Sequence, residues 1–435
     1  MRETERERSV SAMRSDPTLS TIQSLNDSMR IAYIAPYQGP SVLRQRPIVR
    51  NRSLATTTKV ELVTSLLRSN GHEVEVFSQG EVIENSFHFY PGFAEKELFD
   101  PSVPVSYSSS WPIKRMNEFW SCFTLKKLFS ARHRASPFDL VIIWNLKRSQ
   151  IVCARQALDA FGIPAILEYE DDAFHSLEGT QASHYGWQLR FAQEFLAHVP
   201  GCMACSPHLL SQLPSNIPKL LLRGVVGRDL EAARVEKCNR VLFSGSHHKQ
   251  YGIPALVAAW KQLALPDWEL HITGEGPETA TFRKLAEGNP GIHFHGLVSR
   301  ADLVKLMASA KICINPHDTS KTPGNVFAFK IVEYLAAGAH VLTTPMGKLE
   351  KELEEGITYM PDNTATAIAA TLQQVIQEKL YQRTATQQVL GVYGPVASAK
   401  MLEDFIQKSI AEYEKRQTAR CAKATCGCGH AVPAK

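Results

Sequence analysis

The sequence predicts two doubly wound α/β domains in tandem, facing each other across a central cleft. The chain has 435 residues, too many for one ordinary core and about right for two. Short apolar runs alternate with helical periods along it, which is typical of a mainly parallel sheet covered by helices on both faces. The alternation restarts near Asn239, so the domains are placed at 29–227 and 228–400. Ligands of such sheets bind beyond the carboxyl ends of the strands.

The first domain opens with an apolar strand at 30–35, which Pro36 and Gly39 interrupt. A helix with Val60, Val63 and Leu67 on one face follows. Further strands are expected at 73–77, 140–144, 165–169 and 202–205, and helices near 150–160 and 187–197. The aromatic-rich segment 80–136 shows no clear period, and it is interpreted as an insertion or an acceptor-facing subregion.

The second domain repeats the same pattern. Strands are expected at 241–243, 269–272, 292–294, 312–314 and 341–343, and helices near 254–263, 300–307, 327–337 and 365–377. Ser299 and Asp302 resemble a capping box at the start of one of these helices. A last helix at 401–417 is predicted to close this domain. The polar ends, 1–28 and 418–435, are expected to be disordered.

Composition excludes several classes of protein. No apolar run reaches the about 18 residues of a membrane-spanning helix. The charged first residues do not resemble a secretory signal. A net charge of +5 is compatible with a nucleotide, a phosphate-bearing ligand or an anionic membrane surface, and we expect no nucleic-acid partner. Nine scattered cysteines predict reduced thiols in a cytoplasmic protein.

The cysteine-rich end of the chain invites a zinc interpretation. Its candidate ligands are Cys421, Cys426, Cys428 and His430. No two of these cysteines are separated by two residues, as zinc sites usually require, so a plain tail is the favoured interpretation.

The sharpest motif is NVFAFKIVEYLAAGAHVLTT at 325–344. It resembles the family-4 group of retaining GT-B glycosyltransferases (glycosyl transferases group 1), which carry two glutamates with seven residues between them, then a helix and a small-Gly-x-Pro-Val stretch. Glu333 matches the second glutamate, whereas Asn325 replaces the first and His340 replaces the proline. The resemblance implies a GT-B fold of two Rossmann-like domains. It also implies a nucleotide-sugar donor, retention of configuration and neither cofactor nor metal.

The chemistry of this motif supports a donor site. One carboxylate, here Glu333, accepts hydrogen bonds from both vicinal hydroxyls of a ribose. The helix N-terminus, formed by Asn325, Val326 and Phe327, faces the diphosphate, and Lys330 adds a positive charge. The alternative interpretation is a solvated glutamate and a surface lysine.

Two glycine-containing turns extend the resemblance. Two runs, LHITGEGPETATFRKL and GIHFHGLVSRADLVKLMASAKICINP, match the family at two glycine turns and a strand end. The matching residues are Gly274, Gly276, Pro277, Gly296 and Pro316. Glycine lets the backbone approach a nucleotide without a Cβ clash.

The run VLFSGSHHKQYGIPALVAAW departs from the family at its two cations. Gly245 matches, but Ser246 stands where arginine is usual and Tyr251 where lysine is usual. Those cations ordinarily neutralise the leaving diphosphate. Lys249 is the candidate replacement, with His247 or His248 as hydrogen-bond donors; the alternative is that they are ordinary loop residues.

The first domain carries a fainter match. Gly39, in PYQGPSVLRQRPIVRN, occupies the family's glycine-rich loop beside the donor. The arginines that follow it form either a site for a phosphate-bearing acceptor or a solvated basic loop: Arg44, Arg46, Arg50 and Arg52.

In ILEYEDD, Glu170 and Asp171 stand where the family has His-Asp. They are candidates to orient sugar hydroxyls or to accept an acceptor proton, or else they form a helix N-cap cluster. Ser206 matches a family serine and is also a candidate helix cap.

The resemblance predicts retaining hexosyl transfer from a nucleotide sugar to a glycan, lipid-linked or small-molecule acceptor, in polysaccharide or glycoconjugate synthesis. Cytoplasmic location with peripheral contact to the inner membrane face is an expectation from the basic 44–52 segment. Two alternatives stay open: a non-catalytic GT-B scaffold or partner subunit, and a nucleotide-sugar epimerase.

Overall fold

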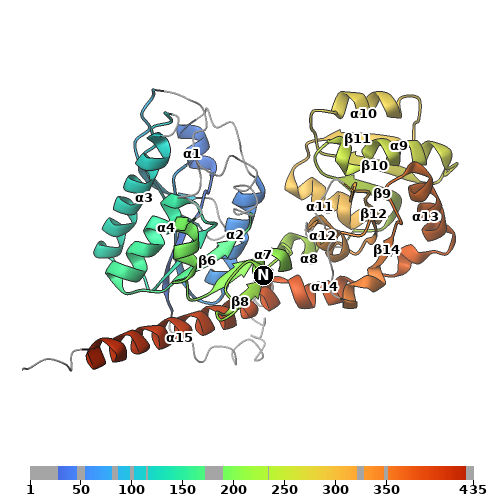
Figure 1. Ribbon diagram of the computed structural model, residues 1–435. Coiled ribbons are helices and arrows are strands. Elements are labelled where there is room, and N and C mark those ends of the chain that lie inside the picture. The colour runs from blue at the N-terminus through green and yellow to red at the C-terminus, as the bar shows by residue number, and fades with distance from the viewer. Residues whose placement is uncertain are drawn as a thin grey trace, which may run out of the picture.

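The computed structural model describes residues 28–46, 54–80, 87–97, 102–113, 116–171, 190–233, 235–320, 328–346 and 351–427. These residues form two α/β lobes side by side, each built on one sheet with helices on both faces (Figure 1). The predicted pair of doubly wound Rossmann-like domains is therefore confirmed.

The sheet of the first domain has the order β3-β4-β2-β1-β5-β6-β7-β8 within the described residues. Its strands are β1 Arg30–Ile34, β2 Glu73–Ser78, β3 Phe93–Glu97, β4 Val103–Tyr107, β5 Leu140–Trp144, β6 Ala165–Tyr169, β7 Cys202–Ala204 and β8 Lys219–Leu221. Among the described strands of this sheet, only β3 pairs antiparallel, against β4, at one edge. The central strands β5 and β6 are buried along their whole length, as expected of a parallel sheet covered on both faces.

Helices cover both faces of this sheet. They include α1 Pro40–Gln45, α2 Leu54–Ser69, α3 Met116–Ala135, α4 Arg148–Arg155 with its π-helical continuation Gln156–Phe161, a helix at 190–196, and α7 Pro207–Ser211. The interpretation of 80–136 as an insertion is wrong, because β3, β4 and α3 belong to the domain itself. Its aromatic residues hide the periodicity, since α3 buries Leu125 and Phe129 while Phe119 and Phe123 stay exposed.

The second sheet is entirely parallel, in the order β11-β10-β9-β12-β13-β14. Its strands are β9 Cys238–Ser244, β10 Glu269–Thr273, β11 Ile292–Gly296, β12 Ala310–Asn315, β13 His340–Thr343 and β14 Ile357–Tyr359. Its helices are α8 Arg228–Ala232, α9 Ile253–Gln262, α10 Thr279–Ala286, α11 Arg300–Ser309, α12 Lys330–Ala336, α13 Ala365–Gln377 and α14 Thr386–Tyr393. Ser299 is confirmed as the N-cap of α11, because its Oγ accepts the Asp302 N–H at 3.1 Å.

The last helix, α15 Pro395–Gly427, corrects two predictions. It lies along the first domain and not the second (Figure 1), because Leu402, Phe405 and Ile406 complete the core over α2. His72 Nε2 and Glu403 Oε2 lie 2.7 Å apart in the same contact. The helix also continues through 418–427, a range expected to be disordered, because this stretch contains good helix formers (alanine, arginine and lysine) and no proline. Of the zinc candidates, Cys428 and His430 lie outside the described residues, as do residues 1–27.

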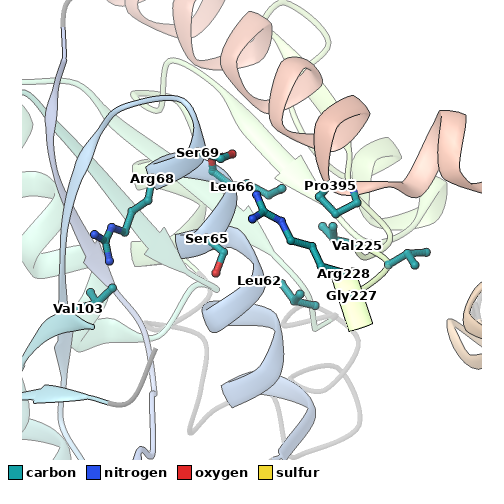
Figure 2. Close-up of a pocket in the computed structure, with 11 residues that line it drawn as sticks. Leu62, Ser65, Leu66, Arg68, Ser69, Val103, Val225, Gly227, Arg228 and Pro395 are labelled. Atoms are coloured by element: carbon teal, nitrogen blue, oxygen red, sulfur yellow. The ribbon is translucent and has the colours of Figure 1, made fainter. Parts of the chain in front are cut away.

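A cavity of about 410 Å³ lies where the chain crosses between the domains (Figure 2). The second half of α2, Val103, the crossing at 225–228 and Pro395 line it. Because α2 runs antiparallel to the strands, this end of it is remote from the carboxyl ends of β1 and β2. The cavity is thus remote from the strand ends of the first domain. Within the described residues, we find no helix with the length and apolarity needed to span a bilayer.

Candidate functional site

The loops after β9 and β10 pack directly against each other at the carboxyl end of the second sheet. A Cβ on Gly274, whose φ is +105°, would lie 2.0 Å from the carbonyl oxygen of Gly245. A Cβ on Gly276 would lie 2.7 Å from the carbonyl oxygen of His247. The His247 N–H donates to the Glu275 carbonyl at 3.1 Å. These glycines therefore bring the two loops together, a role that differs from the predicted approach of backbone to nucleotide.

Gly274→Ala is expected to destabilise the protein by about 2 to 4 kcal/mol, because it adds steric overlap to an unfavourable φ. Urea unfolding of the full chain measures this loss. Gly288→Ala is the matched control: its φ is +79° and nothing lies within 4 Å of the added Cβ. It should cost only the about 1 to 2 kcal/mol of the backbone conformation. Equal losses in the two variants would show that the loop contact is unimportant.

The loop after β9 also closes on the loop after β12. A Cβ on Gly252, with φ +74°, would lie 1.8 Å from the carbonyl oxygen of Pro316. The rings of Tyr251 and His317 make an edge contact with centroids 4.8 Å apart. Tyr251, which replaces the family's lysine, thus packs its ring against the loop after β12.

Lys330 begins α12 and reaches back toward the end of β9. Its Nζ lies 4.9 Å from the ring centroid of Phe243 and 5.3 Å from that of Tyr251. The same Nζ is 3.0 Å from where a Cβ on Gly245 would stand. Among the described residues, no oxygen accepts a hydrogen bond from this ammonium and no carboxylate pairs with it. Burial lowers the pKa of Lys330 to about 8. The site therefore holds a cation that no described anion neutralises.

Glu333, one turn further along α12, is engaged by an arginine that the sequence analysis missed. Arg300 Nη1 donates to Glu333 Oε1 at 2.7 Å, and Arg300 Nε donates to Asp229 Oδ2 at 2.8 Å. Arg300 begins α11 and Asp229 lies on α8, which follows the crossing between the domains. The predicted ribose carboxylate is therefore oriented by a residue that also contacts the interdomain segment. No signal in the motif identifies Arg300, because it is remote from Glu333 in sequence.

The predicted replacement cation, Lys249, is not brought to Lys330. Its side chain is 76% exposed and its Nζ lies 4.0 Å from Glu278 Oε1. Ser246 is exposed as well, whereas His247 is buried and its Nδ1 lies 3.0 Å from Thr279 Oγ1. Lys330 is thus the better placed cation, and a phosphate contact by Lys249 stays a prediction.

Three predicted donor residues, Asn325, Val326 and Phe327, lie outside the described residues. Gly39 is buried in the first domain, and its N–H donates to the Tyr107 hydroxyl at 3.2 Å. A donor contact by Gly39 therefore stays a prediction.

The two described arginines after Gly39, Arg44 and Arg46, do not form one site. Arg46 is buried, and its guanidinium donates to the carbonyls of Gln79, Gly80, Pro91 and Ser108. Arg46 is therefore a structural residue, and its prediction as an acceptor-phosphate ligand is wrong. Arg44 is exposed and pairs with Glu95 at 3.3 Å, while Arg50 and Arg52 lie outside the described residues.

Glu170 and Asp171 follow β6 and are held by Asn145. Asn145 Oδ1 accepts the Glu170 N–H at 2.7 Å, and Asn145 Nδ2 donates to Asp171 Oδ2 at 2.8 Å. Asn145 adopts φ +61° in the loop after β5, which makes both contacts possible. The Glu170 carboxylate points inward and accepts from Lys59 Nζ at 2.8 Å. Asp171 is exposed, so it is the better placed of the two for a ligand.

Lys59 belongs to a buried polar cluster that the sequence analysis also missed. Its Nζ donates to the Leu222 carbonyl at 2.8 Å and lies 3.8 Å from Glu168 Oε1. Glu168 is fully buried in β6 and its other oxygen accepts from the Tyr33 hydroxyl. Burial raises the pKa of Glu168 and Lys59 opposes that rise. The only sequence signal was a glutamate within the apolar run 165–169.

Comparisons with known proteins agree with this architecture. Residues 238–378 match the family described as Glycosyl transferases group 1. The fold is similar to that of sucrose-phosphate synthase from Thermosynechococcus elongatus, at 17% identity and a TM-score of 0.58, covering 88% of this chain and 99% of that one. No curated protein matches.

Two further structures share the fold. Anabaena Alr3699/HepE, solved with UDP-glucose, has 15% identity and a TM-score of 0.54, covering 87% and 99% of the two chains. A putative UDP-N-acetylglucosamine 2-epimerase from Listeria monocytogenes has 12% identity and a TM-score of 0.53, covering 89% and 98%. These likenesses establish the GT-B fold. The family match adds support for a group 1 glycosyltransferase.

Proposed function

From the match of residues 238–378 to group 1 glycosyltransferases, we propose that this chain is a retaining family-4 enzyme that moves a hexose from a nucleotide sugar to an acceptor. The observation that carries the proposal is the unneutralised ammonium of Lys330, held near the loops after β9 and β12 with Glu333 one turn away. A nucleoside diphosphate supplies the anion that this cation lacks and the ribose hydroxyls that a carboxylate accepts.

In the proposed reaction, the bond from the anomeric carbon to the donor's diphosphate breaks and a bond to the acceptor oxygen forms on the same face of the sugar. The departing phosphate oxygen takes the acceptor's proton, so no enzyme nucleophile is needed. Lys330 stabilises the charge that develops on the diphosphate, in a half-buried setting where that interaction is stronger than in water. This arrangement calls for no resident cofactor or metal in the donor site.

We assign the acceptor side to the first domain. Asp171 is exposed at the carboxyl end of β6 and Asn145 fixes one of its oxygens, so the other is available to a sugar hydroxyl. The Glu170 carboxylate accepts a hydrogen bond from Lys59, so we assign it a structural role in this loop and no direct role in the reaction. The acceptor class is a glycan, a lipid-linked sugar or a small molecule. Cytoplasmic location with peripheral membrane contact belongs to the same proposal.

Calorimetric titration with UDP, GDP and ADP tests the donor site. We expect one nucleotide to bind the wild type and Glu333→Ala to weaken its binding about tenfold to a hundredfold, because two charge-assisted hydrogen bonds to the ribose are lost. Glu378→Ala, at the far end of α13, should leave binding unchanged. Glu333→Gln separates the lost charge from the lost side chain.

Two outcomes favour the alternatives. If no nucleotide binds to any variant, the loss of the family's cations at Ser246 and Tyr251 has removed the donor site, and the scaffold interpretation holds. If a nucleotide sugar changes configuration with no acceptor present, as followed by proton NMR, the chain is an epimerase.

A further inference from the structure

Four polar side chains share one face of the edge of the second sheet. Glu269 and His271 lie on β10, and His293 and His295 lie on β11. Alternate residues of a strand point to the same face. Because His271 and His293 are paired in the parallel register, their rings lie side by side, with centroids 4.8 Å apart. The residues between them, among them Leu270 and Ile272, fill the core on the opposite face.

The ligand atoms of three of these residues converge. Glu269 Oε2 lies 2.9 Å from His271 Nε2, and Glu269 Oε1 lies 3.8 Å from His293 Nε2. One ligand atom from each residue lies within 4.8 Å of the other two. Small rotations of the exposed Glu269 and half-exposed His293 side chains bring such a set around one ion. Two imidazoles and a carboxylate suit Zn²⁺ and neighbouring divalent transition metals.

His295 gives this cluster a supporting contact of the kind that metal sites use. His271 Nδ1 lies 2.8 Å from His295 Nε2, so the ring nitrogen that faces away from Glu269 has its own partner. Such a contact fixes the tautomer and orientation of a ligating histidine. His271 is also buried, so its ring is held in place before any ion binds.

One neighbouring cation opposes an ion at this place. Arg240 lies beside Glu269 on β9 and its Nη2 is 3.9 Å from Glu269 Oε2. Its Nη1, however, donates to Ser309 Oγ at 2.7 Å, which holds the guanidinium toward α11. Glu269 therefore has a short contact with His271 and only a long one with Arg240.

We propose that Glu269, His271 and His293 bind a divalent transition-metal ion, with Zn²⁺ the best match to their ligand atoms. Glu269 and His271 are the first and third residues of β10. The loop after β10, which belongs to the proposed donor site, begins at the other end of this strand, after Thr273. The ion thus joins the edge strand β11 to β10 and takes no part in sugar transfer. The proposal is independent of the proposed function.

Titration of the full chain with Co²⁺ and Zn²⁺ tests the proposal. We expect the wild type to bind one equivalent of Co²⁺ with a visible spectrum that lacks a thiolate charge-transfer band, which separates this site from the chain's cysteines. Glu269→Gln and His293→Ala should weaken that binding at least tenfold. His198→Ala, an exposed histidine in the first domain, is the control and should bind as the wild type does.

Thermal unfolding supplies a second readout. An ion that binds only the folded chain raises its Tm. Zn²⁺ should raise the Tm of the wild type and of His198→Ala, but not that of His293→Ala, whose Tm without metal shows that it folds. Equal binding and equal Tm increments in all variants would overturn the proposal, as would a spectrum carried only by thiolate.

Discussion

Lys330→Met is expected to lower kcat by about 10²- to 10³-fold, the effect of removing one preorganised group that stabilises developing negative charge. The same substitution should raise the Tm of the ligand-free protein. Both effects have one cause: Lys330 carries a positive charge that no described carboxylate neutralises, next to the rings of Phe243 and Tyr251. Methionine keeps the length and packing of the side chain and removes its charge.

The pH dependence follows from the lowered pKa of Lys330, which is about 8. An unfolded lysine titrates near 10.4, so the unfolded chain binds the additional proton between about pH 8 and pH 10. The wild type should therefore gain stability across that window, and Lys330→Met should not. Nucleotide affinity should fall as the pH rises above 8, because the ammonium is then lost. The titratable neighbours of Lys330 are Tyr251 and His317, and a lowered pKa leaves His317 neutral in this window.

Lys249→Met is the control for Lys330→Met. The Lys249 ammonium is exposed to solvent, and its contact with Glu278 Oε1 is long, at 4.0 Å. We expect little change in kcat, in nucleotide affinity or in Tm. A large loss of activity in Lys249→Met with none in Lys330→Met would reverse the assignment of the phosphate cation.

Lys59→Met is expected to destabilise the protein by about 3 to 5 kcal/mol, the cost of removing one partner from a buried ion pair. Lys59 is the cation shared by Glu168 and Glu170, and it also satisfies the Leu222 carbonyl. Without it, two carboxylates remain at the carboxyl end of β6 with no described cation between them. Urea unfolding at pH 7 measures the loss.

The pH profile of this variant identifies the cause. Burial raises the pKa of Glu168, so the folded chain binds more protons than the unfolded chain above the ordinary glutamate pKa. Stability therefore falls as the pH rises through this window, and the fall should be steeper in Lys59→Met because the opposing cation is gone. Glu168→Gln keeps the shape and removes the charge, so it should flatten the profile. A uniform loss at every pH would indicate lost packing instead.

The fold was accessible from sequence because both domains repeat a simple pattern of buried strands and one-faced helices. The run 140–144 could only be a covered strand, and the Ser299 cap marked the start of α11. The prediction for segment 80–136 was wrong because Phe119 and Phe123 of α3 are exposed. The apolar residues of this helix therefore do not all lie on one face. The prediction for the last helix was wrong for a different reason. Its own sequence does not indicate which domain it packs against.

The site was predicted in part for the same physical reason. Glu333 and Lys330 belong to one contiguous motif and were found together. Arg300, Lys59 and Asn145 act on the motif residues from other elements, and only the fold brings them there. Glu269 and His271 alternate in the sequence of β10, so they are expected on one face of the strand. Only the fold shows that His293 of β11 lies beside them.

The packing of α15 against α2 gives the chain an unusual order of assembly. The core of the first domain takes Leu402, Phe405 and Ile406 from the last helix, so residues 29–227 alone lack one of its walls. A ribosome that has finished the first domain must still synthesise the whole second domain before that wall exists. At translation rates of about 5 to 20 residues per second, the delay is roughly 10 to 40 seconds. Throughout that interval the part of this core that Leu402, Phe405 and Ile406 later cover is open to chaperones or to a neighbouring nascent chain.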